Sequence, residues 1–316
     1  MMKAIILKNS GSVDNLIHTE IAKPEPQADE VLIKVKAISI NPVDVKARQN
    51  EGVLDWLFGE TRPVILGWDI SGEVIALGQD VNSFQVGDEV FGMVNFPGHG
   101  KSYAEYVSAT ANQLALKPKA ISHEQAAAST LAALTALQAL RTEGNIQPNQ
   151  SVLVHAGSGG VGHFAIQIAK HFGANVISTS SSKNKDFILS LGADQHIDYQ
   201  SSSFENSVSE VDFVLDAMAG EVLKKSISVT KESGQIITIP SGEIDPETVE
   251  LAKKKNVDLS FMLVQSNGDD MKLIAELLES MAIIPHVSTV YDFEDMDKAH
   301  LQIESGRTVG KIVVKI

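Results

Sequence analysis

The chain has no cysteine in its 316 residues. This absence excludes disulfides, a thiolate nucleophile and every zinc site that depends on cysteine sulfur. It is also compatible with a reducing compartment, and we expect a cytoplasmic location.

Long apolar runs and excess positive charge are missing as well. No stretch approaches the roughly 20 consecutive apolar residues of a membrane span. The N-terminal MMKAIILKNSG has no small-residue cleavage site and is interpreted as a first strand rather than a signal. The 26 Lys and Arg residues are outnumbered by 40 Asp and Glu, which gives a net charge of -14. We therefore expect neither nucleic acid nor a membrane as a partner.

The remaining composition, 43% apolar and 21% charged, is ordinary for a globular protein. The length predicts two domains, because single cores stop growing near about 250–300 residues. Residues 1–120 contain short β-branched or alternating runs such as MKAIIL, EVLIKVKAISI and DEVFGMV. They predict a β-rich half with one short helix near 43–50.

From Ser122 onward the pattern changes. Ser122 and Gln125 have the spacing of a capping box, and the Ala/Leu-rich helix that follows is apolar almost all round, so we expect it to be buried. Strands and helices then alternate through SVLVHA, NVIST, HID, VDFVLDA, GQIITIP and VDLSFMLV. Such alternation predicts an α/β fold with a doubly wound, six-stranded parallel sheet. Two helical patterns follow residue 265, and the final strand VGKIVVKI is predicted to return to the N-terminal half.

The most informative motif is Gly157-x-Gly159-x-x-Gly162, which follows a strand and opens a helix. In that context Gly157 allows the tight turn, Gly159 lets the backbone approach a pyrophosphate and Gly162 lets the helix pack on the strand. The helix N-terminus adds N–H groups and a positive dipole end. A plain Gly-rich turn is the alternative, and the surrounding βαβ pattern disfavours it. The predicted cofactor contacts here are Gly157, Ser158, Gly159, Gly160, Val161 and Gly162.

Acidic residues are absent between Gly157 and Lys185. An NAD enzyme carries an acid for the ribose 2′-OH about 20 residues past the glycines, but this chain has the stretch VISTSSSKNK there. Hydroxyls and ammonium groups would bind a 2′-phosphate, whereas an acid would repel it by roughly 2–3 kcal/mol. The site therefore favours NADPH, although a solvated loop with incidental lysines is the alternative. The predicted contacts are Ser180, Ser181, Lys183, Lys185 and Tyr199.

Taken together, the chain resembles the medium-chain dehydrogenase/reductase superfamily, in its zinc-independent quinone and enone oxidoreductase branch. The matching segments are ISINPVDVKAR, ILGWDISGEVIALG, FQVGDEVFG, SYAEYV, AAASTLAALTALQAL, HAGSGGVG, SLGADQHIDY and SGRTVGKIVV. The resemblance implies a GroES-like catalytic domain, residues 1–120 and 266–316. It also implies a Rossmann cofactor domain, residues 121–265, with the cofactor in the cleft.

The resemblance also identifies residues that zinc-dependent relatives have and this chain lacks. Those relatives place a Cys at the position of Asn41, a His at that of Trp68 and a four-cysteine lobe beyond residue 90. We therefore expect no metal, and activity that survives chelation. His155, His163 and His171 are interpreted as packing or surface residues. A zinc alcohol dehydrogenase is set aside because its ligands are missing.

Without metal or thiol, hydride from the cofactor is the main chemistry, and the protein supplies orientation and electrostatics. A quinone would become a quinol, whose oxygens take protons from solvent. An α,β-unsaturated ketone or aldehyde would take hydride at its β-carbon, and its enolate oxygen would need a hydrogen-bond donor. Asn41 and Lys46 are the candidate donors. Asp44 is interpreted as a local cap or a partner in an ion pair rather than as a catalytic group, and Lys46 as either functional or a solvated surface lysine.

The resemblance alone assigns the other site residues. It implies further cofactor contacts at Thr135, Met218, Ile239, Phe261 and Lys311. It implies Trp68 in the cleft wall, and Trp56 with Phe58 forms a candidate apolar substrate lip. The apolar members have an alternative interpretation as ordinary core.

The strand at 257–264 is expected at the edge of its sheet, and family members commonly dimerise there, so we expect a homodimer. The alternative to an enzyme is a protein that binds NADPH without catalysing a reaction. The intact glycine motif favours the enzyme.

Overall fold

The computed structural model describes residues 1–208, 210–240 and 242–316. The chain divides into two compact units, Met1–Leu134 with Gln265–Ile316, and Thr135–Val264. The boundary expected at residue 120 therefore moves to Leu134. The reason is that the helix α3 (His123–Ala128) packs against the strands β3 (Glu30–Ile40) and β4 (Asp69–Leu77) of the first unit.

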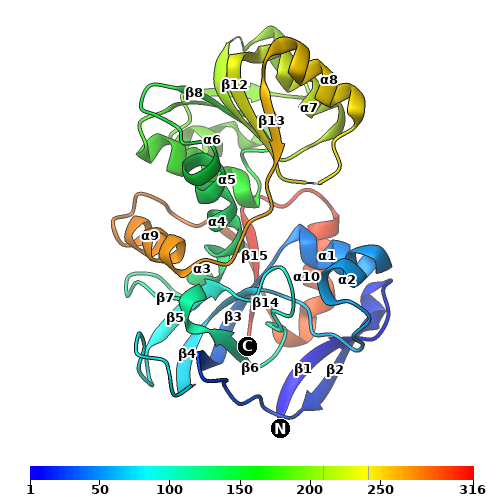
Figure 1. Ribbon diagram of the computed structural model, residues 1–316, viewed down its shortest axis with the longest axis vertical. Helices are drawn as coiled ribbons and strands as arrows, with labels where there is room; N and C mark the ends of the chain where they lie inside the picture. The colour runs from blue at the N-terminus through cyan, green and yellow to red at the C-terminus, as the bar shows by residue number, and fades with distance from the viewer. Residues whose placement is uncertain (209, 241) are drawn as a thin grey trace. The chain divides into compact units, whose positions relative to one another are not determined.

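The first unit is built on a mostly antiparallel seven-stranded sheet (Figure 1). Its strand order is β14-β15-β3-β4-β5-β7, with β6 also paired to β3. The bounds are β5 (Glu89–Met93), β6 (Tyr106–Thr110), β7 (Ala115–Leu116), β14 (Val287–Asp292) and β15 (Lys311–Lys315). The last strand places Ile312 opposite Ile40 of β3, so the prediction that the C-terminal strand returns to the N-terminal half is confirmed.

Shorter elements complete this unit. The hairpin β1 (Met2–Leu7) and β2 (Leu16–Ile21) forms a separate two-stranded sheet. The helices are α1 (Pro42–Gln49), α2 (Glu51–Phe58), α9 (Gly268–Glu279) and α10 (Met296–Glu304). The short helix expected near 43–50 and both helices expected after residue 265 are present, whereas α2, β2 and β14 were not predicted.

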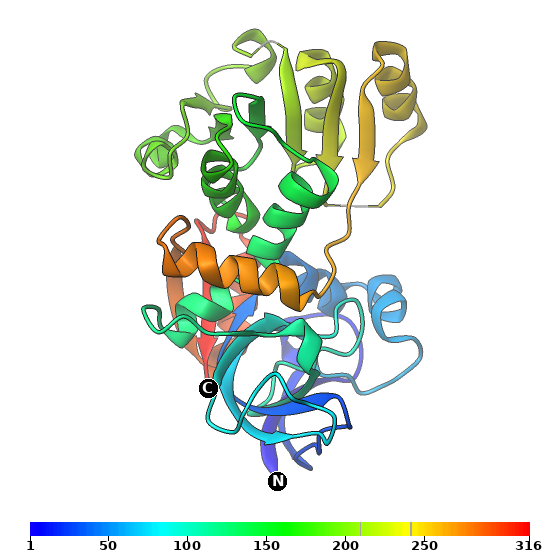
Figure 2. The same cartoon turned by 60° about the vertical axis from the view of Figure 1, so that its left-hand side comes forward.

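The second unit contains the parallel six-stranded sheet that the sequence predicts, in the order β10-β9-β8-β11-β12-β13. Its strands are β8 (Ser151–Val154), β9 (Asn175–Ser180), β10 (Gln195–Asp198), β11 (Val211–Asp216), β12 (Thr230–Thr238) and β13 (Asp258–Phe261). The helices are α5 (Gly160–His171), α6 (Lys185–Ser190), α7 (Gly220–Val229) and α8 (Pro246–Lys255). Figures 1 and 2 show helices on both faces of this sheet. Apolar strand residues such as Leu153, Val214 and Ile236 are fully buried beneath them.

The Ala/Leu-rich segment is buried as expected, but it is not one helix. It consists of α3, α4 (Leu131–Leu137) and a π-helical turn at Gln138–Glu143. Ser122 and Gln125 form the predicted capping box. The interruption falls at Ser129 and Thr130, whose hydroxyls donate to the carbonyls of Gln125 and Ala127. Such side-chain bonds compete with the helical ladder. Within the described residues, no helix has the length and apolar character needed to cross a bilayer.

Candidate active site

The glycine turn of the second unit joins β8 to α5, whose N-cap is Gly159. A Cβ added at Gly162 would lie 2.3 Å from the carbonyl oxygen of Ala156, so no side chain fits there. A Cβ at Gly159 would meet only that oxygen, at 3.2 Å, and the space beyond it is open. The turn therefore leaves room for a pyrophosphate beside the first N–H groups of a twelve-residue helix.

Gly157 has a different role from the one expected. The left-handed residue of the turn is Ala156, at φ 53°, and Gly157 has no positive φ. A Cβ at Gly157 would lie 1.9 Å from Oγ of Ser178 on the neighbouring strand β9. The absence of a side chain at Gly157 thus allows the turn to pack against β9 rather than allowing the backbone conformation.

The selectivity stretch, VISTSSSKNK at residues 176–185, begins within β9, ends at the first residue of α6 and lies beside the glycine turn. Ser180 and Ser181 are buried, whereas Lys183 and Lys185 are exposed and Tyr199 is 61% exposed. The amide Nδ2 of Asn184 donates to Oγ of Ser158 at 3.0 Å and lies 3.4 Å from Oγ of Ser181. Asn184, which the sequence analysis missed, therefore connects the glycine turn to the selectivity stretch.

Two further residues near this stretch come from β10. The parallel register of β10 with β9 sets Asp198 beside Ser180. The carboxylate of Asp198 accepts backbone N–H groups from Gln200, at 3.0 Å, and from Ser182, and these bonds lower its pKa. The imidazole Nε2 of His196 lies 2.9 Å from Oγ of Ser180. An acid is thus close to the stretch in space although none lies within it in sequence.

Other predicted cofactor contacts follow the neighbouring strands β11 and β12. Asp216 lies at the end of β11, and its burial raises the pKa of its carboxyl. The carboxylate accepts a hydrogen bond from the N–H of Met218 at 3.1 Å and another from Oγ1 of Thr238 at 2.7 Å. These bonds hold the turn that carries Met218, which is 53% exposed. Ile239 and Phe261 are half-buried and Thr135 is buried.

In the first unit, the side chain of Asn41 is buried between two charged residues. Its Nδ2 donates to Oδ2 of Asp69 at 2.8 Å, and its Oδ1 accepts from Nζ of Lys311. Lys311 also donates to the carbonyl of Ile40 at 3.2 Å and pairs with Asp69 at 3.7 Å. Burial raises the pKa of Asp69 and lowers that of Lys311. The Asn41 amide therefore has partners within the chain, and its role as a substrate donor stays a prediction.

Asp44 adds a second buried carboxylate to this cluster. Its Oδ2 accepts the N–H of Asn41 at 2.7 Å and closes a capping box on α1, so the interpretation of Asp44 as a cap is confirmed. Burial, together with the negative charge of Asp69, raises the pKa of Asp44 to about 7. Its Oδ1 is buried without a hydrogen-bond partner of good geometry, and the Tyr103 hydroxyl is close enough to lower the pKa of the carboxyl.

A hydrogen-bond chain continues from Tyr103 to α10. The Tyr103 hydroxyl lies 2.8 Å from Nε2 of His300, and Nε of Arg48 lies 3.3 Å from Nδ1 of the same ring. Arg48 also pairs with Glu304, whose side chain is 26% exposed. Burial lowers the pKa of His300 to about 3. No spacing pattern indicated this chain, because its members come from distant parts of the sequence.

The remaining predicted site residues of this unit do not gather on one surface. Lys46 is exposed on α1. Trp68 and Phe58 are buried and stacked, with ring centroids 6.0 Å apart, whereas Trp56 is 57% exposed. Residues two apart on a helix point about 200° apart. Trp56 and Phe58 therefore point to different sides of α2, and a substrate lip formed by both stays a prediction. The burial of Trp68 fits either a cleft wall or ordinary core.

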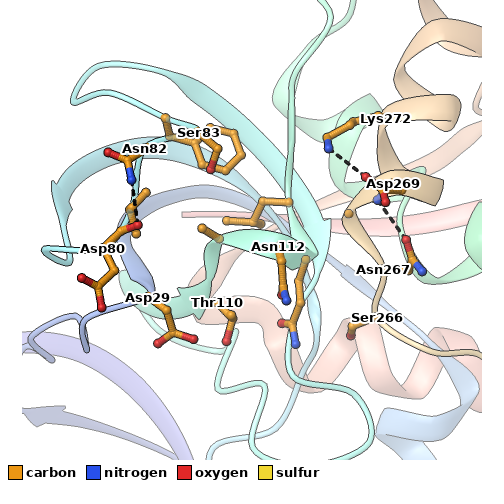
Figure 3. A pocket seen from close by; sticks show the side chains of 16 residues that line it. Asp29, Asp80, Asn82, Ser83, Thr110, Asn112, Ser266, Asn267, Asp269 and Lys272 are labelled. Carbon is orange, nitrogen blue, oxygen red and sulfur yellow. Dashed lines mark hydrogen bonds and ion pairs between the residues drawn. The ribbon is translucent and has the colours of Figure 1, made fainter.

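A pocket of about 700 Å³ lies elsewhere in the first unit (Figure 3). It is formed by the loop after β4, the segment Thr110–Leu114 and the start of α9. Asp29 and Asp80 contribute carboxylates, and Asp269 is paired with Lys272 at 2.8 Å. None of the predicted site residues lines this pocket, so it is separate from the cofactor and substrate contacts discussed above.

Three histidines of the second unit, His155, His163 and His171, are packing or surface residues, as expected. His155 is buried between Oγ1 of Thr179, at 3.1 Å, and Oγ of Ser226, at 2.9 Å. His163 is buried against the carbonyl of Gly159, and His171 is exposed. Within the described residues, no three His, Asp or Glu side chains form a group that would hold a metal ion.

These two units combine a GroES-like sheet with a parallel dinucleotide-binding sheet, the architecture of a two-domain oxidoreductase. The alcohol dehydrogenase GroES-like domain family matches residues 27–119, and the zinc-binding dehydrogenase family matches residues 191–314. An NADPH-dependent alkenal/one oxidoreductase of Arabidopsis thaliana is 36% identical over 99% of this chain and 79% of its own length.

Solved structures agree with these family matches. The quinone oxidoreductase of Coxiella burnetii is 38% identical, with a TM-score of 0.93 over 100% of this chain and 99% of that one. A mycobacterial protein solved with NADPH is 28% identical, with a TM-score of 0.87 and full coverage of both chains. The chain belongs to the medium-chain dehydrogenase/reductase superfamily, in its zinc-independent quinone oxidoreductase branch. It is an NADPH-dependent oxidoreductase.

Proposed function

We propose that the chain transfers hydride from NADPH to a quinone. The observation that carries this choice is that the Asn41 amide is already bonded within the chain. Its Nδ2 donates to Asp69 and its Oδ1 accepts from Lys311, so it supports a substrate that needs little from a protein donor. Hydride transfer to a quinone gives a hydroquinone anion, which takes one proton from solvent to become the quinol. This reaction needs the fewest donors from the protein, and the Coxiella burnetii quinone oxidoreductase supports it.

The second candidate is reduction of the C=C bond of an α,β-unsaturated ketone or aldehyde. The exposed ammonium of Lys46 favours it, because an enolate oxygen needs a positive or hydrogen-bonding partner. The Arabidopsis alkenal/one oxidoreductase supports the same substrate class. Here hydride adds to the β-carbon, and a proton adds to the α-carbon as the enolate collapses to the saturated carbonyl compound.

Three groups of residues, together with Lys311, make up the proposed cofactor site. The glycine turn holds the pyrophosphate, and the open side of Gly159 supports this assignment. Ser180, Ser181, Lys183, Lys185 and Tyr199 hold the 2′-phosphate. Thr135, Met218, Ile239 and Phe261 line the nicotinamide side. Lys311 remains a cofactor contact in this proposal, although its ammonium already has Ile40, Asn41 and Asp69 as partners.

The test compares kcat/KM for a 1,4-benzoquinone and for an alkenone, with NADPH, in the wild type and in Lys46→Ala. Loss of a donor to the enolate lowers alkenone turnover by roughly 10²–10³-fold, while quinone turnover stays unchanged. Lys119→Ala, at another exposed lysine of the same unit, is the matched control. NADPH binding without oxidation on either substrate would establish the rival, a non-catalytic NADPH-binding protein.

We also propose a homodimer in which the edge strand pairs with its copy in a second chain. β13 lies at the end of the six-stranded sheet, and its Leu259 and Phe261 are only half-buried. An unpaired apolar edge favours pairing with another strand. Analytical ultracentrifugation of the wild type should give twice the chain mass, and Leu259→Lys should give a monomer. A monomeric wild type contradicts the proposal. The cytoplasmic location stays a prediction.

A further inference from the structure

His196 lies on β10 opposite Ser178 of β9, within the selectivity stretch. Its Nε2 is 2.9 Å from Oγ of Ser180, and that hydroxyl donates its single proton to the carbonyl of Ser181 at 3.1 Å. Nε2 must therefore carry a proton and donate it to Ser180. The result is a hydrogen-bond chain from His196 through Ser180 to Ser181, a residue of the proposed 2′-phosphate site.

In this tautomer the other ring nitrogen, Nδ1, is the one that gains a proton when the imidazole becomes charged. Four effects set that charge. Burial and the positive charge of Lys185 on α6 lower the pKa of His196, whereas the negative charge of Asp198 on β10 and a hydrogen bond to the backbone of Ser180 raise it. Asp198 itself bonds the backbone N–H groups of Ser182 and Gln200. Without a ligand, the net effect is a lowered pKa, so the ring is neutral at pH 7, and it lies near Lys185, whose positive charge would attract a phosphate.

We propose that His196 is a further specificity residue, which takes up a proton when the 2′-phosphate of NADPH binds at Ser181 and Lys183 and so strengthens binding of NADPH relative to NADH. A phosphate dianion next to Lys185 cancels the positive charge that opposes protonation of the ring. It also adds a negative charge that attracts the imidazolium. NADH has a hydroxyl at this position and causes neither effect. This inference rests on the proposed 2′-phosphate site.

Affinity measurements with cofactor fragments test the inference without any turnover. Calorimetric titration with 2′,5′-ADP and with 5′-AMP, at pH 6 and pH 8, compares fragments that differ only in the 2′-phosphate. In the wild type we expect the preference for 2′,5′-ADP to be roughly tenfold greater at pH 6 than at pH 8, since one pKa unit is a factor of ten. In His196→Gln, which keeps an N–H donor for Ser180 but cannot titrate, the preference should no longer increase toward pH 6. It should be slightly smaller there, because a phosphate monoester with a second pKa of about 6 has lost part of its charge. His171→Gln, on the exposed face of α5, should behave as the wild type.

A second measurement uses the unaltered protein and does not depend on the variant folding. Titration of the His196 ring by NMR should show its pKa raised by 2′,5′-ADP and unchanged by 5′-AMP. A ring pKa that does not move, or a preference for 2′,5′-ADP that still increases toward pH 6 in His196→Gln, overturns the inference while leaving the NADPH site intact. Equal binding of the two fragments at both pH values overturns the 2′-phosphate site itself, and the inference with it.

Discussion

The hydroxyl of Tyr103 lies 2.8 Å from Nε2 of His300, and His300 is the donor in that hydrogen bond. The guanidinium of Arg48 has donors and no acceptor, so its Nε donates to Nδ1 of His300. The neutral ring therefore carries its own proton on Nε2 and donates it to Tyr103. The phenol proton is then available for Asp44, which is the next polar group in the cluster. The buried cluster thus has a defined hydrogen-bond direction from α10 toward α1.

This arrangement predicts that a contribution of Asp44 to stability, present at acid pH, is lost as the pH rises to neutral. The pKa of Asp44 rises from 3.8 to about 7 on folding, so the folded state binds more protons than the unfolded state between these values. Its contribution to stability is complete below pH 4 and is lost as the pH rises to 7. Between pH 6 and pH 8 the loss is about 1–2 kcal/mol.

Asp44→Asn keeps an acceptor for the Asn41 N–H and cannot ionise. Urea unfolding at pH 6 and pH 8 should show a smaller decrease in midpoint for this variant than for the wild type. Asp29→Asn, at an exposed carboxylate of the same unit, is the control and should resemble the wild type. An equal decrease in all three proteins would contradict the assignment of the buried proton to Asp44.

Protonation of His155 should make the stability of the protein depend on pH in the opposite direction, in the acid range. Ser226 donates to the carbonyl of Val222 and so accepts from Nε2 of His155, which leaves Nδ1 to accept from Thr179. Burial lowers the pKa of this neutral ring from 6.5 to about 4. Its contribution is present above pH 6.5 and is lost as the pH falls toward 4, by up to about 3 kcal/mol. Compared with the wild type, His155→Gln should lose less stability between pH 6.5 and pH 5, and His171→Gln should not differ.

Local patterns predicted the parts of this protein that are held by local contacts. The capping box at Ser122, the start of α5 at the glycine turn and the extent of each of the six strands depend on residues close in sequence. The break at Ser129 and Thr130 was not predicted although its cause is local, because Ser and Thr also occur inside helices without ending them.

The buried polar cluster was not predictable in the same way. Tyr103 and His300 are 197 residues apart, and Arg48 and His300 are 252 apart. Their contact depends on the return of the C-terminal segment to the first unit, and the sequence predicted that return without predicting which side chains would meet. Likewise, Asp198 and His196 reach the selectivity stretch through strand register rather than through spacing along the chain.

Substitutions at two glycines of the turn should separate an effect on stability from an effect on cofactor binding. In Gly162→Ala the new Cβ would lie 2.3 Å from a backbone oxygen, so we expect destabilisation of about 1–3 kcal/mol. In Gly159→Ala the corresponding contact is 3.2 Å, and stability should change little while NADPH affinity falls. Thermal unfolding and fluorescence titration with NADPH measure the two effects. If Gly159→Ala bound NADPH as the wild type does, the pyrophosphate would not lie at this turn.

Metal removal should leave the activity unchanged. The indole Nε1 of Trp68 donates to the carbonyl of Gly98 at 2.8 Å and has no lone pair for a metal, while Asn41 is bonded to Asp69 and Lys311. NADPH oxidation with a quinone should therefore be the same before and after dialysis against 1,10-phenanthroline, with metal content measured in both samples. Activity that is lost on chelation and restored by Zn²⁺ would refute this expectation.

Cofactor preference should depend on the charge at Ser181. Glu at this position would place a carboxylate within roughly 8 Å of the 2′-phosphate, and at an effective dielectric near 20 the repulsion is about 2 kcal/mol, or roughly 30-fold in affinity. Ser181→Glu should therefore lower kcat/KM for NADPH by at least about that factor and leave kcat/KM for NADH unchanged or higher. Ser228→Glu, at an exposed serine near the end of α7, controls for the added charge. A parallel loss with both cofactors would mean that the substitution distorts the loop instead of repelling the phosphate. In that case the bond between Asn184 and Ser181 would be the first contact to examine, because Asn184 also bonds Ser158 of the glycine turn and both cofactors use that turn.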